Sequence, residues 1–573
     1  MSFADLKQKI EPLFGADQIS LVERAYQFAE KAHAGQTRKS GEPYLVHPLF
    51  IALKLAELKM DQATIAAALL HDVVEDSGVL LSTIEAEFGS DVAFLVDGVT
   101  KLGKLKYRGI ERMAESLRKM VLATAEDVRV VLIKLNDRLH NMETLKALPE
   151  EKHRRIALET LEIYAPLADR LGLGSLKARL EDLAFPYVYP EEHSWLSRNV
   201  RDAFEERSEY LKQLAPEIEK VLREEAVPII AMDARAKHQY SLWRKLMKFD
   251  MDIAKIHDLI ALRVIVPTVA DCYQALGVIH AHWRPLPGKI KDYIALPKPN
   301  GYKSLHTTVF GPDGKIAEIQ IRTIAMHEEA EHGIAAHWKY SQTKQTKLYH
   351  ENVASKADKK EISWVKDLRD WQKDVSDSDE FLQTLKIDFF KNRIFALTPK
   401  GDAVDLPEGA TALDFAYHVH SQIGNSASGA RVNGKMVPLD HEISNFDVVE
   451  IITQKNKKPA ADWLEFVKTS MARKHITSRL RRDAEQKRFG TKPGGLLVEL
   501  RVTARDRIGL LNDLTSAIRA FRINIRDHKT ETAHRSHPLI ILTCAIKSSD
   551  ELRKLLMKLK SVKGVEEVNY KIL

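Results

Sequence analysis

The hydrophobic pattern of this 573-residue chain changes its period near residue 228, and no other feature constrains the fold as strongly. Up to about residue 190 apolar residues recur every three or four positions, as in LVERAYQFAEKAHA and EDVRVVLIKLNDRLHNMETL, which predicts one helix after another. From 228 to 340 short β-branched runs such as LIALRVIV stand between helices, which predicts an α/β domain. Because the length exceeds what one core can hold, several domains are expected.

The second half of the chain is expected to hold smaller modules. Residues 341–386 are polar and rich in Lys and Asp, which favours a helical linker. Turn signals such as TPKGD and VNGK separate short strands at 387–453, which suits a β-grasp module. A basic helix at about 461–488 precedes a hinge-like FGTKPGG. The tail, 496–573, has the order strand, helix, strand, strand, helix, strand, which is typical of a ferredoxin-like fold.

The bulk composition favours an ordinary globular protein of the cytoplasm, with no membrane partner. The chain is 44% hydrophobic and 29% charged, and no apolar run approaches the roughly 18 residues that span a bilayer. The N-terminal MSFADLKQKIEPLF has acids and lysines where a signal peptide needs an apolar core. With only Cys272 and Cys544, a metal would have to bind to His and carboxylate side chains. The formal charge of +7 favours anionic ligands.

The segment IAAALLHDVVED carries the first candidate site. An almost wholly apolar helix belongs in a core, yet this one ends in His71 and Asp72, followed by Glu75 and Asp76. Helical spacing places His71 with Glu75, and Asp72 with Asp76, on adjoining strips of one face. Four ionisable groups at the end of a buried helix are unfavourable unless they are paired or bind a metal.

Two further apolar helices repeat this design. In VVLIKLNDRLHNM, Asp137 and Asn141 stand four residues apart, and His47 opens a helix at VHPLF. A lone buried His or Asp is usually a hydrogen-bonded core residue, but the recurrence at three helix ends favours a functional site. Two imidazoles with carboxylates suit a borderline ion such as Mn²⁺, with positions left for water.

A second candidate site lies on the predicted sheet. In EIQIR the residues Glu318, Gln320 and Arg322 share one strand face, which is either a ligand surface or an ordinary solvent face. Asp258 precedes LIALRVIV, where it could bind Mg²⁺ together with Glu318. The segments ARAKHQYSLWRK and GKIKDYIALPKPNGYKSLHTT are rich in Lys, Arg, His and Tyr, which suits phosphoryl transfer. The sequence contains no GxxxxGK[ST], so it is not a P-loop enzyme.

Four segments resemble the hydrolase half of RelA/SpoT homologues, the (p)ppGpp enzymes: TRKSGEPYLVHP, LLHDVVED, GVTKL and LNDRLHNM. Their set of His and Asp residues resembles that of HD phosphohydrolases. The resemblance implies that a metal activates a water that removes the 3′-pyrophosphate, with Glu75 and Asp76 handling protons and orienting the water. The intact HDVVED implies a live hydrolase. The implied Mn²⁺ ligands are His47, His71, Asp72 and Asp137, and the implied nucleotide contacts are Arg38, Lys39 and Asn141.

The segments around Asp258 and Glu318 resemble the RelA/SpoT synthetase domain, which moves the β,γ-pyrophosphate of ATP to the 3′-hydroxyl of GDP or GTP. The resemblance implies that these two carboxylates bind Mg²⁺. The implied substrate contacts are Arg235, Lys237, Ser241 and Lys245 for ATP, and Tyr302, stacked on guanine, with Lys298, Asn300 and His306 for the guanosine nucleotide. The word KIKD at 289–292 resembles the basic signature of bifunctional members, with Lys289 in place of Arg.

The C-terminal half resembles the TGS and ACT domains of the same family, at 387–453 and 496–573. The resemblance implies that the TGS domain binds deacylated tRNA through His420, or a metabolic regulator protein, and that the ACT domain binds a small effector or a second copy. A packing or hydrogen-bonding histidine is the alternative for His420. The basic helix could contact RNA phosphates or only solvent, with Arg473, Lys474, Arg479, Arg481 and Arg482. No Cys/His zinc-finger segment separates the two domains, which argues against ribosome docking of the usual kind.

Together these patterns predict a bifunctional, multidomain α and α+β enzyme. Its two opposing activities are expected to bias one another. The alternatives are a hydrolase whose synthetase domain only binds nucleotide, and an RNA- or effector-sensing protein with two vestigial sites. The predicted parts are an all-helical HD hydrolase domain at 1–195, an α/β nucleotidyltransferase-like synthetase domain at 196–340, a linker at 341–386, a β-grasp TGS domain at 387–453, a basic helix and hinge at 454–495, and a ferredoxin-like ACT domain at 496–573.

Overall fold

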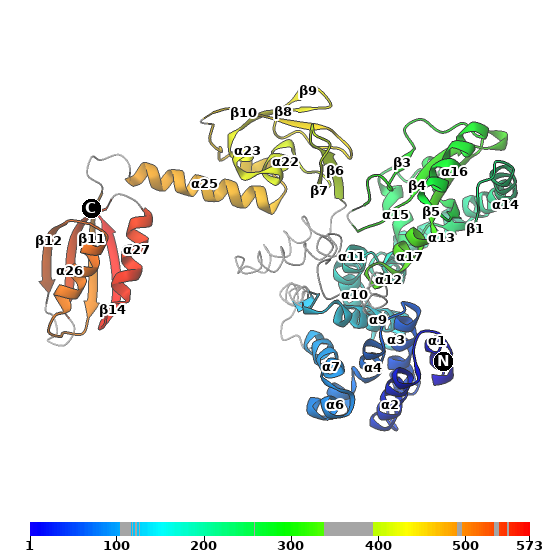
Figure 1. Cartoon of the computed structure of the whole chain (residues 1–573), viewed down its shortest axis with the longest axis horizontal. Helices are drawn as coiled ribbons and strands as arrows, with labels where there is room; N and C mark the ends of the chain where they lie inside the picture. Colours follow the sequence, from blue (N-terminus) through cyan, green and yellow to red (C-terminus); the bar gives the residue numbers. More distant parts are fainter. Residues whose placement is uncertain are drawn as a thin grey trace. The chain divides into compact units, whose positions relative to one another are not determined.

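A computed structural model describes residues 1–103, 116, 119–120, 123–124, 126–256, 258–298, 300–336, 393–455, 457–489, 496–531, 538–546 and 549–573. The chain divides into two compact units, Met1–Phe390 and Lys391–Leu573, and Figure 1 labels most of their elements. The linker expected at 341–386 and the hinge after residue 489 lie outside the described residues.

The first part of unit 1 is all-helical, as predicted. Helices α3 and α4 are apolar on nearly every side, and eight of the nine residues of α4 are buried. Such helices belong in a core, and the other helices pack around them. The helices are α1 (Phe3–Ile10), α2 (Ala16–Ala32), α3 (Val46–Glu57), α4 (Gln62–Leu70), α5 (Val73–Asp76), α6 (Leu81–Phe88), α7 (Ser90–Gly103), α9 (Val128–Glu143), α10 (Glu150–Glu159), α11 (Ala165–Arg170), α12 (Gly174–Val188) and α13 (Pro190–Asn199).

The predicted helix through HDVVED is broken in the structure. Helix α4 ends at Leu70, and Asp72 is the N-cap of the four-residue helix α5. The Nδ1 of His71 lies 2.8 Å from the carbonyl oxygen of Ala68, which a continuing helix would pair with the amide of Asp72. The side chain of His71 therefore competes with the next backbone hydrogen bond. As a result His71 is buried while Glu75 is exposed, so these two do not share one face as expected.

The second part of unit 1 is the predicted α/β domain. Its mixed sheet has the order β1-β2-β5-β4-β3, in which only β2 and β5 are parallel. Helices α14 and α16 pack their apolar residues on this sheet. The elements are α14 (Arg201–Glu224), β1 (Ala231–Ala236), α15 (Gln239–Met247), β2 (Ile260–Val266), α16 (Val269–His282), β3 (Lys291–Asp292), β4 (Leu305–Phe310), β5 (Ile316–Thr323) and α17 (Ile324–His332).

The two parts of unit 1 meet where the turn between α11 and α12 contacts the end of α17. The amide of Ile334 donates to the carbonyl oxygen of Leu171 at 2.9 Å. Two glycines with positive φ, Gly172 and Gly333, face each other at this contact. A Cβ on Gly172 would lie 3.0 Å from the Cα of Gly333, and one on Gly333 would overlap the carbonyl oxygen of Leu171. No side chain larger than hydrogen fits at either position without a shift.

Unit 2 begins with a small module of two sheets and the helices α22 and α23, which α24 and α25 follow. Strands β6 and β7 pair with each other, and the second sheet has the order β10-β8-β9. The elements are β6 (Arg393–Leu397), β7 (Ala403–Pro407), α22 (Ala412–Val419), α23 (Ser421–Ser426), β8 (Ala427–Val432), β9 (Lys435–Val437), β10 (Val449–Thr453), α24 (Trp463–Phe466) and α25 (Ser470–Phe489).

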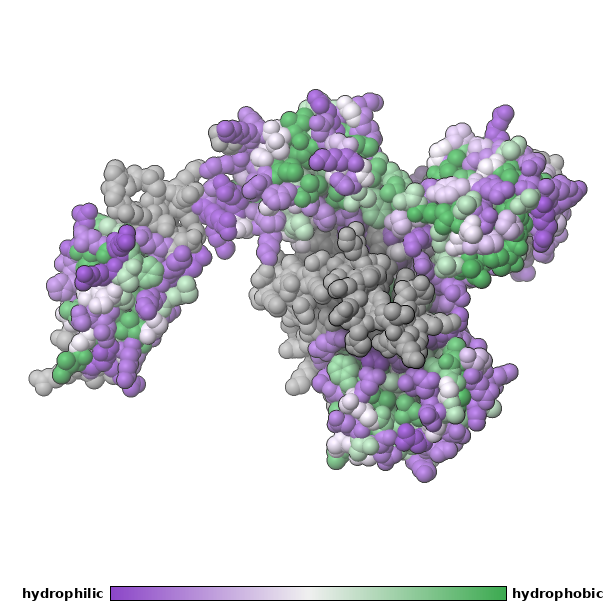
Figure 2. Space-filling view, viewed as in Figure 1, coloured by the Kyte–Doolittle hydropathy of each residue, from purple (hydrophilic) through white to green (hydrophobic). Residues whose placement is uncertain are grey.

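The single basic helix predicted at 461–488 is two helices, α24 and α25. The buried carboxylate of Asp414 accepts hydrogen bonds from the amides of Lys468 and Thr469, at 3.0 Å and 2.8 Å, and from the Thr469 hydroxyl. These bonds cap α25 at its N-terminus and interrupt the helix between the two segments. In Figure 2 the coloured part of α25 is mostly hydrophilic.

Unit 2 ends in the predicted ferredoxin-like order. Its antiparallel sheet runs β12-β13-β11-β14 and packs its apolar face on α26 and α27. Within the described part of the chain, every helix is too short or too polar to cross a bilayer. The elements are β11 (Leu496–Ala504), α26 (Leu510–Ala520), β12 (Ile525–Glu531), β13 (Leu539–Ile546), α27 (Ser549–Lys560) and β14 (Val565–Ile572).

Candidate active sites

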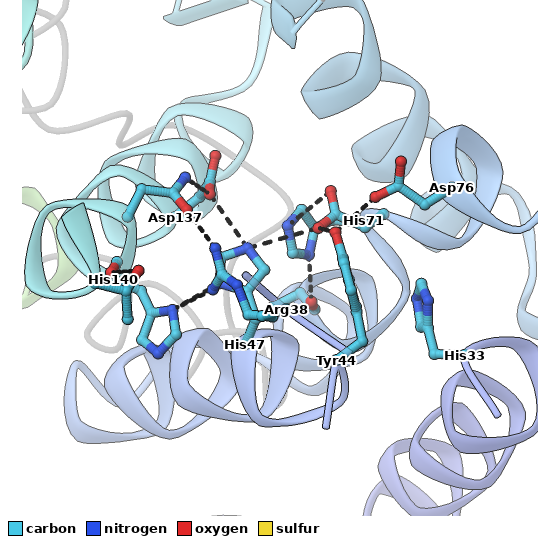
Figure 3. A network of polar contacts seen from close by, with 12 residues as sticks. His33, Arg38, Tyr44, His47, His71, Asp76, Asp137 and His140 are labelled. Atoms are coloured by element: carbon cyan, nitrogen blue, oxygen red, sulfur yellow. Dashed lines mark hydrogen bonds and ion pairs between the residues drawn. The ribbon is translucent and has the colours of Figure 1, made fainter. Parts of the chain in front are cut away.

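Three side chains from three helical segments meet in the core of the helical domain (Figure 3). His47 is on α3, His71 follows α4, and Asp137 is on α9. All three are buried, and one potential ligand atom of each lies within 4.8 Å of the others. The fourth predicted ligand, Asp72, lies beside them, with Oδ1 3.1 Å from Nε2 of His71 and Oδ2 3.5 Å from Nε2 of His47.

These side chains fit a divalent cation. The Nδ1 of His71 is used by the Ala68 carbonyl, and its buried Nε2 faces the carboxylate of Asp72. Burial lowers the pKa of His71, but Asp72 and Asp137 outweigh this effect and raise it to about 9. The carboxylates that favour a proton on this nitrogen also favour a metal ion. Two imidazoles and two carboxylates are a donor set for a borderline divalent metal.

Two residues that the sequence analysis did not single out hold the acidic groups. The Nζ of Lys134 donates to Oδ2 of Asp137 at 2.7 Å. The hydroxyl of Tyr44 lies 2.8 Å from Oδ2 of Asp72 and 2.6 Å from Oδ2 of Asp76, so it links the two carboxylates. Burial and the charge of Asp72 raise the pKa of Tyr44, which keeps the phenol protonated. The helical spacing of Lys134 and Asp137 was a signal for the contact between these two residues. No local pattern in the sequence indicated the contacts of Tyr44 with Asp72 and Asp76.

A further missed residue, His140, connects the cluster to the predicted nucleotide contacts. Its Nδ1 lies 2.6 Å from Nη1 of Arg38 and 2.9 Å from Nδ1 of His47. Arg38 also donates to Oδ1 of Asn141 at 2.7 Å, and Asn141 donates to Asp137 at 2.5 Å. Burial and the charges of His47 and Arg38 lower the pKa of His140 to about 3, so its Nδ1 is an acceptor. Arg38 and Asn141 thus lie next to the metal cluster.

The remaining predicted hydrolase residues lie at the surface. Lys39, Glu75 and Asp76 are exposed, while their neighbours in the cluster are not. Asp76 is tied to the cluster through Tyr44. The structure therefore brings together all of the predicted metal ligands and two of the predicted nucleotide contacts, and places the two predicted proton-handling acids outside the buried centre.

The α/β domain contains a cavity of about 370 Å³ that is strongly cationic. Six lysines and only two carboxylates line it, and such a charge balance attracts polyphosphates. Its walls come from α15, the sheet strands β3, β4 and β5, and the loops beside them. The lining residues are Lys237, Lys245, Phe249, Lys255, Asp258, Lys289, Lys291, Tyr293, Lys298, His306, Thr308, Glu318 and Gln320.

Both carboxylates of the cavity are held in the ionised form. The ammonium groups of Lys237 and Lys245 each lie 2.6 Å from a different oxygen of Asp258. Burial raises the pKa of Asp258, but the two lysines dominate and lower it to about 2. Glu318 lies 3.3 Å from Nδ1 of His306 and accepts from Gln320 at 3.0 Å, which lowers its pKa against the effect of burial. Two ionised carboxylates in a lysine-lined cavity fit Mg²⁺.

Four of the predicted synthetase residues line this cavity besides the two acids, and four do not. Lys237, Lys245, Lys298 and His306 belong to the lining. Two of the other four make contacts within the α/β domain, Arg235 with Glu331 at 3.4 Å and Tyr302 with His306 at 2.8 Å. The remaining two contact the helical domain, Ser241 with Glu181 at 3.4 Å and Asn300 with Asp169 at 3.2 Å.

The predicted polar face of β5 divides into two environments. Glu318 and Gln320 line the cavity, whereas Arg322 is fully buried. Its Nη2 lies 2.7 Å from Nδ1 of His327, on α17. The alternation of the strand was therefore predicted correctly, but the packing of α17 separates the guanidinium from the other two side chains.

In unit 2 the predicted tRNA contact, His420, is exposed and caps a helix. Its Nδ1 accepts a hydrogen bond from the amide of Gln422 at 3.1 Å, at the N-terminus of α23. Capping accounts for the Nδ1 atom alone, so the contact with RNA and the hydrogen-bonding role are compatible.

Comparison with known families assigns each part of the chain. Residues 25–174 match the HD domain, 234–345 the region found in RelA / SpoT proteins, 394–453 the TGS domain and 493–569 the ACT domain. The predicted fold class is thereby confirmed.

Curated relatives cover most of the chain. It is 48% identical to a GTP pyrophosphokinase of Myxococcus xanthus, over 82% of this chain and 61% of that protein. It is 47% identical to the guanosine-3′,5′-bis(diphosphate) 3′-pyrophosphohydrolase of Aquifex aeolicus, over 87% and 69%. It is 44% identical to the bifunctional (p)ppGpp synthase/hydrolase SpoT of Escherichia coli, over 84% and 67%. The chain spans between 57% and 69% of the length of the curated relatives it matches. With HD, synthetase, TGS and ACT regions in this order, and 44–47% identity to the Aquifex aeolicus and Escherichia coli relatives over 84–87% of its length, the chain belongs to the RelA/SpoT family.

Proposed function

We propose that this chain is a bifunctional alarmone enzyme of the cytoplasm. It removes the 3′-pyrophosphate from (p)ppGpp, and it transfers pyrophosphate from ATP to the 3′-hydroxyl of GDP or GTP. The observation that supports this most is the presence of two chemically different sites in one compact unit: a buried His/Asp cluster and a lysine-lined cavity with two ionised carboxylates. The relatives carry names for each activity and for both together.

In the hydrolase site, the four metal ligands of the His/Asp cluster would hold a divalent ion, which we take to be Mn²⁺. When bound, such an ion supplies Lewis-acid polarisation of the 3′-phosphate and activation of the attacking water. The attack forms a new P–O bond, the bond between phosphorus and the 3′ oxygen breaks, and pyrophosphate leaves. Asp76, fixed by Tyr44 at 2.6 Å, accepts the proton of the water and returns it to the 3′ oxygen, with Glu75 orienting the water. Arg38, Lys39 and Asn141 bind the nucleotide.

In the synthetase site, Asp258 and Glu318 would hold Mg²⁺, which supplies charge neutralisation on the triphosphate. The 3′-hydroxyl of the guanosine nucleotide attacks the β-phosphorus of ATP, the bond from this phosphorus to the α-phosphate oxygen breaks, and AMP leaves. The hydroxyl proton passes to a carboxylate oxygen of Glu318. The implied ATP contacts, Arg235, Lys237, Ser241 and Lys245, hold the triphosphate, and Lys298, Asn300, Tyr302 and His306 hold the guanosine nucleotide.

We further propose that unit 2 is regulatory. The TGS domain would bind deacylated tRNA through the exposed His420, or a metabolic regulator protein, and the ACT domain would bind an effector or a second copy. The predicted domain limits at 195, 340, 386, 453 and 495 belong to the same proposal. An electrophoretic assay with deacylated and aminoacylated tRNA tests the first part, and His420→Ala should weaken only the binding of the deacylated form.

Two reactions with purified full-length protein test the catalytic proposal. One contains ppGpp and Mn²⁺, and the other contains ATP, GDP and Mg²⁺, with products separated by nucleotide chromatography. We expect ppGpp to disappear in the first and to form in the second. His71→Ala should abolish only the first reaction, and Glu318→Ala only the second. Exchanging the metals between the tubes tests the assignment of Mn²⁺ and Mg²⁺.

Two other outcomes of these reactions would each support a different function. Hydrolysis without synthesis would favour a hydrolase whose second domain only senses nucleotide. Nucleotide binding without turnover in either tube would favour a regulatory protein with two vestigial sites.

A further inference from the structure

The helical domain contributes a residue to the neighbourhood of the synthetase cavity. We propose that Asp169, at the end of α11, positions the nucleotide loop of the synthetase, here Lys298 and residues 300–302, so that the hydrolase half of the chain helps to hold GDP or GTP in the other active site. The inference rests on the proposed function, because it concerns the guanosine nucleotide of that reaction.

The two oxygens of Asp169 have different partners. Oδ1 accepts a hydrogen bond from Nδ2 of Asn300 at 3.2 Å, and Oδ2 accepts one from Nζ of Lys177, on α12, at 3.0 Å. The first bond crosses from the helical domain to the nucleotide loop, and the second stays within the helical domain. Lys177 and Asn300 thus use different oxygens of the carboxylate, and Asp169 orients the amide of Asn300.

The loop continues this contact toward the reacting groups. Oδ1 of Asn300 lies 3.3 Å from the amide of Tyr302, so the side chain of Asn300 engages Asp169 at one end and the loop backbone at the other. The hydroxyl of Tyr302 lies 2.8 Å from Nε2 of His306, whose Nδ1 lies 3.3 Å from Glu318. A continuous series of polar contacts therefore joins Asp169 to a proposed Mg²⁺ ligand.

Close packing holds the turn that follows Asp169 against the loop. The backbone of the α11–α12 turn lies against the loop and against the end of α17. A Cβ on Gly172 would lie 3.2 Å from the carbonyl oxygen of Asn300 and 3.0 Å from the Cα of Gly333. Within the loop, the amide of Gly301 donates to the carbonyl oxygen of Lys298 at 2.8 Å. The loop cannot move toward the α11–α12 turn without displacing it.

The charge of Asp169 acts on the same loop. Lys298 faces the cavity, and the protein around it lowers its pKa to about 8, while Asp169 is the carboxylate that opposes this effect. Asp169 therefore favours the charged form of an ammonium group that lines the phosphate-binding cavity. Position and charge both point to the guanosine nucleotide rather than to ATP.

The alternative is that Asp169 only pairs with Lys177 and stabilises α12. Two variants of the full-length protein separate the roles. Asp169→Ala removes the hydrogen bonds to both Asn300 and Lys177, whereas Lys177→Met removes only the bond inside the helical domain. Asp169→Asn keeps an acceptor oxygen for Asn300 and tests rescue.

The readouts are the KM of GDP and of ATP in the synthesis reaction, the Kd of GDP by calorimetry, and thermal unfolding. We expect Asp169→Ala to raise the KM and Kd of GDP about tenfold, a typical effect of losing a hydrogen bond to a charged group. The KM of ATP should change less than twofold. Asp169→Asn should recover part of the GDP affinity, and Lys177→Met should keep most of it.

An unchanged Kd of GDP in Asp169→Ala would overturn the inference. So would equal losses of GDP and ATP affinity in Asp169→Ala and Lys177→Met, because these indicate a purely structural ion pair. If the unsubstituted protein binds GDP but forms no product from ATP and GDP, the proposed synthetase activity fails instead, and the calorimetric comparison still decides the role of Asp169.

Discussion

Lys298 is a single ammonium group whose protonation should control the affinity for the guanosine nucleotide. Its pKa is lowered to about 8 by the protein packed around it, whereas the neighbouring phenols of Tyr293 and Tyr302 have raised pKa values and stay neutral. Below pH 8 the ammonium is charged and attracts phosphate; above pH 8 the proton is lost. We therefore expect the KM of GDP to rise roughly tenfold between pH 7 and pH 9.

Steady-state synthesis assays over this pH range, at saturating ATP, measure the effect. Lys298→Arg is the matched variant, because a guanidinium stays charged throughout. Its KM of GDP should be flat from pH 7 to pH 9. If the variant and the unsubstituted protein keep the same rise, another group causes it, and Lys245, whose pKa is also lowered, is the next to test.

His140 should set the tautomer of a metal ligand. Arg38 can only donate, so Nδ1 of His140 is the acceptor, and Nδ1 of His47 must donate to it at 2.9 Å. That leaves Nε2 of His47 with a lone pair toward the metal cluster. Removing such a supporting partner typically weakens metal affinity about 10–100-fold. We expect this loss of Mn²⁺ affinity in His140→Ala, measured on full-length protein by electron paramagnetic resonance titration.

His140→Gln, which offers an amide oxygen as acceptor, should bind Mn²⁺ more tightly than the alanine variant. His153→Ala is the control. Within the described residues the ring of His153 hydrogen-bonds to the carbonyl oxygen of Leu148, which is not part of the His/Asp cluster. An alanine variant of His140 that binds Mn²⁺ like the unsubstituted protein would rule out the supporting role.

At the scale of elements, the contact between the α11–α12 turn and α17 depends on glycine. Gly333 has a φ of 52°, and a Cβ there would overlap the carbonyl oxygen of Leu171. Gly314 also has a positive φ, 70°, but open space around it. We expect Gly314→Ala to lower the Tm by a few degrees through backbone strain alone. Gly333→Ala should lower it by roughly 5 °C more, because the two domains must separate to admit the methyl group.

Differential scanning calorimetry of both variants checks this difference. Equal Tm values for Gly333→Ala and Gly314→Ala would mean that the contact at Leu171 yields without loss of stability.

Elements with a strong internal period were predictable from the sequence. The α14 helix, the β2 and β5 strands and the ferredoxin-like order of the C-terminal module were all expected, since each carries its own hydrophobic pattern. The two helix breaks were not. One arises because the ring of His71 competes for the carbonyl of Ala68. The other arises because Asp414, far away in the sequence, captures the amides of Lys468 and Thr469.

The same distinction applies to the sites. The His/Asp cluster was predictable because each of its residues stands in or directly beside an apolar helical run, so burial and charge coincide in the sequence. The partners of these residues were harder to see. Tyr44 reaches Asp72 and Asp76 across different elements, and Arg322 is separated from the other polar side chains on its face of β5 because α17 packs over it. Such contacts depend on tertiary packing, and no local spacing encodes them.

At the scale of unit 1, helix α12 lies between the two sites. It packs on α9, which carries Asp137, and on α15 and α17 of the synthetase domain. Its Asp182 accepts from the amide of Tyr240 at 3.0 Å and contacts His238 at 2.9 Å, at the start of α15. Lys237 immediately precedes this start and lines the cavity. A nucleotide that contacts Lys237 therefore acts on the start of α15 and, through it, on α12. Helix α12 also packs on α9, which carries Asp137 of the His/Asp cluster.

We expect GDP together with a non-reactive ATP analogue to slow the hydrolysis of ppGpp, by a factor within the range of about 5–150 that typical coupling energies give. The measurement is the rate of ppGpp hydrolysis at increasing analogue concentration. Asp182→Ala should reduce the factor, because it detaches α12 from α15, whereas Asp202→Ala, at an exposed position of α14, should not.

Linkage adds a stricter requirement: a ppGpp analogue in the hydrolase site must weaken the binding of GDP and the ATP analogue by the same factor by which they weaken its own binding. Hydrolysis that is unaffected at saturating analogue, or unequal factors in the two binding titrations, would mean that α12 does not couple the sites.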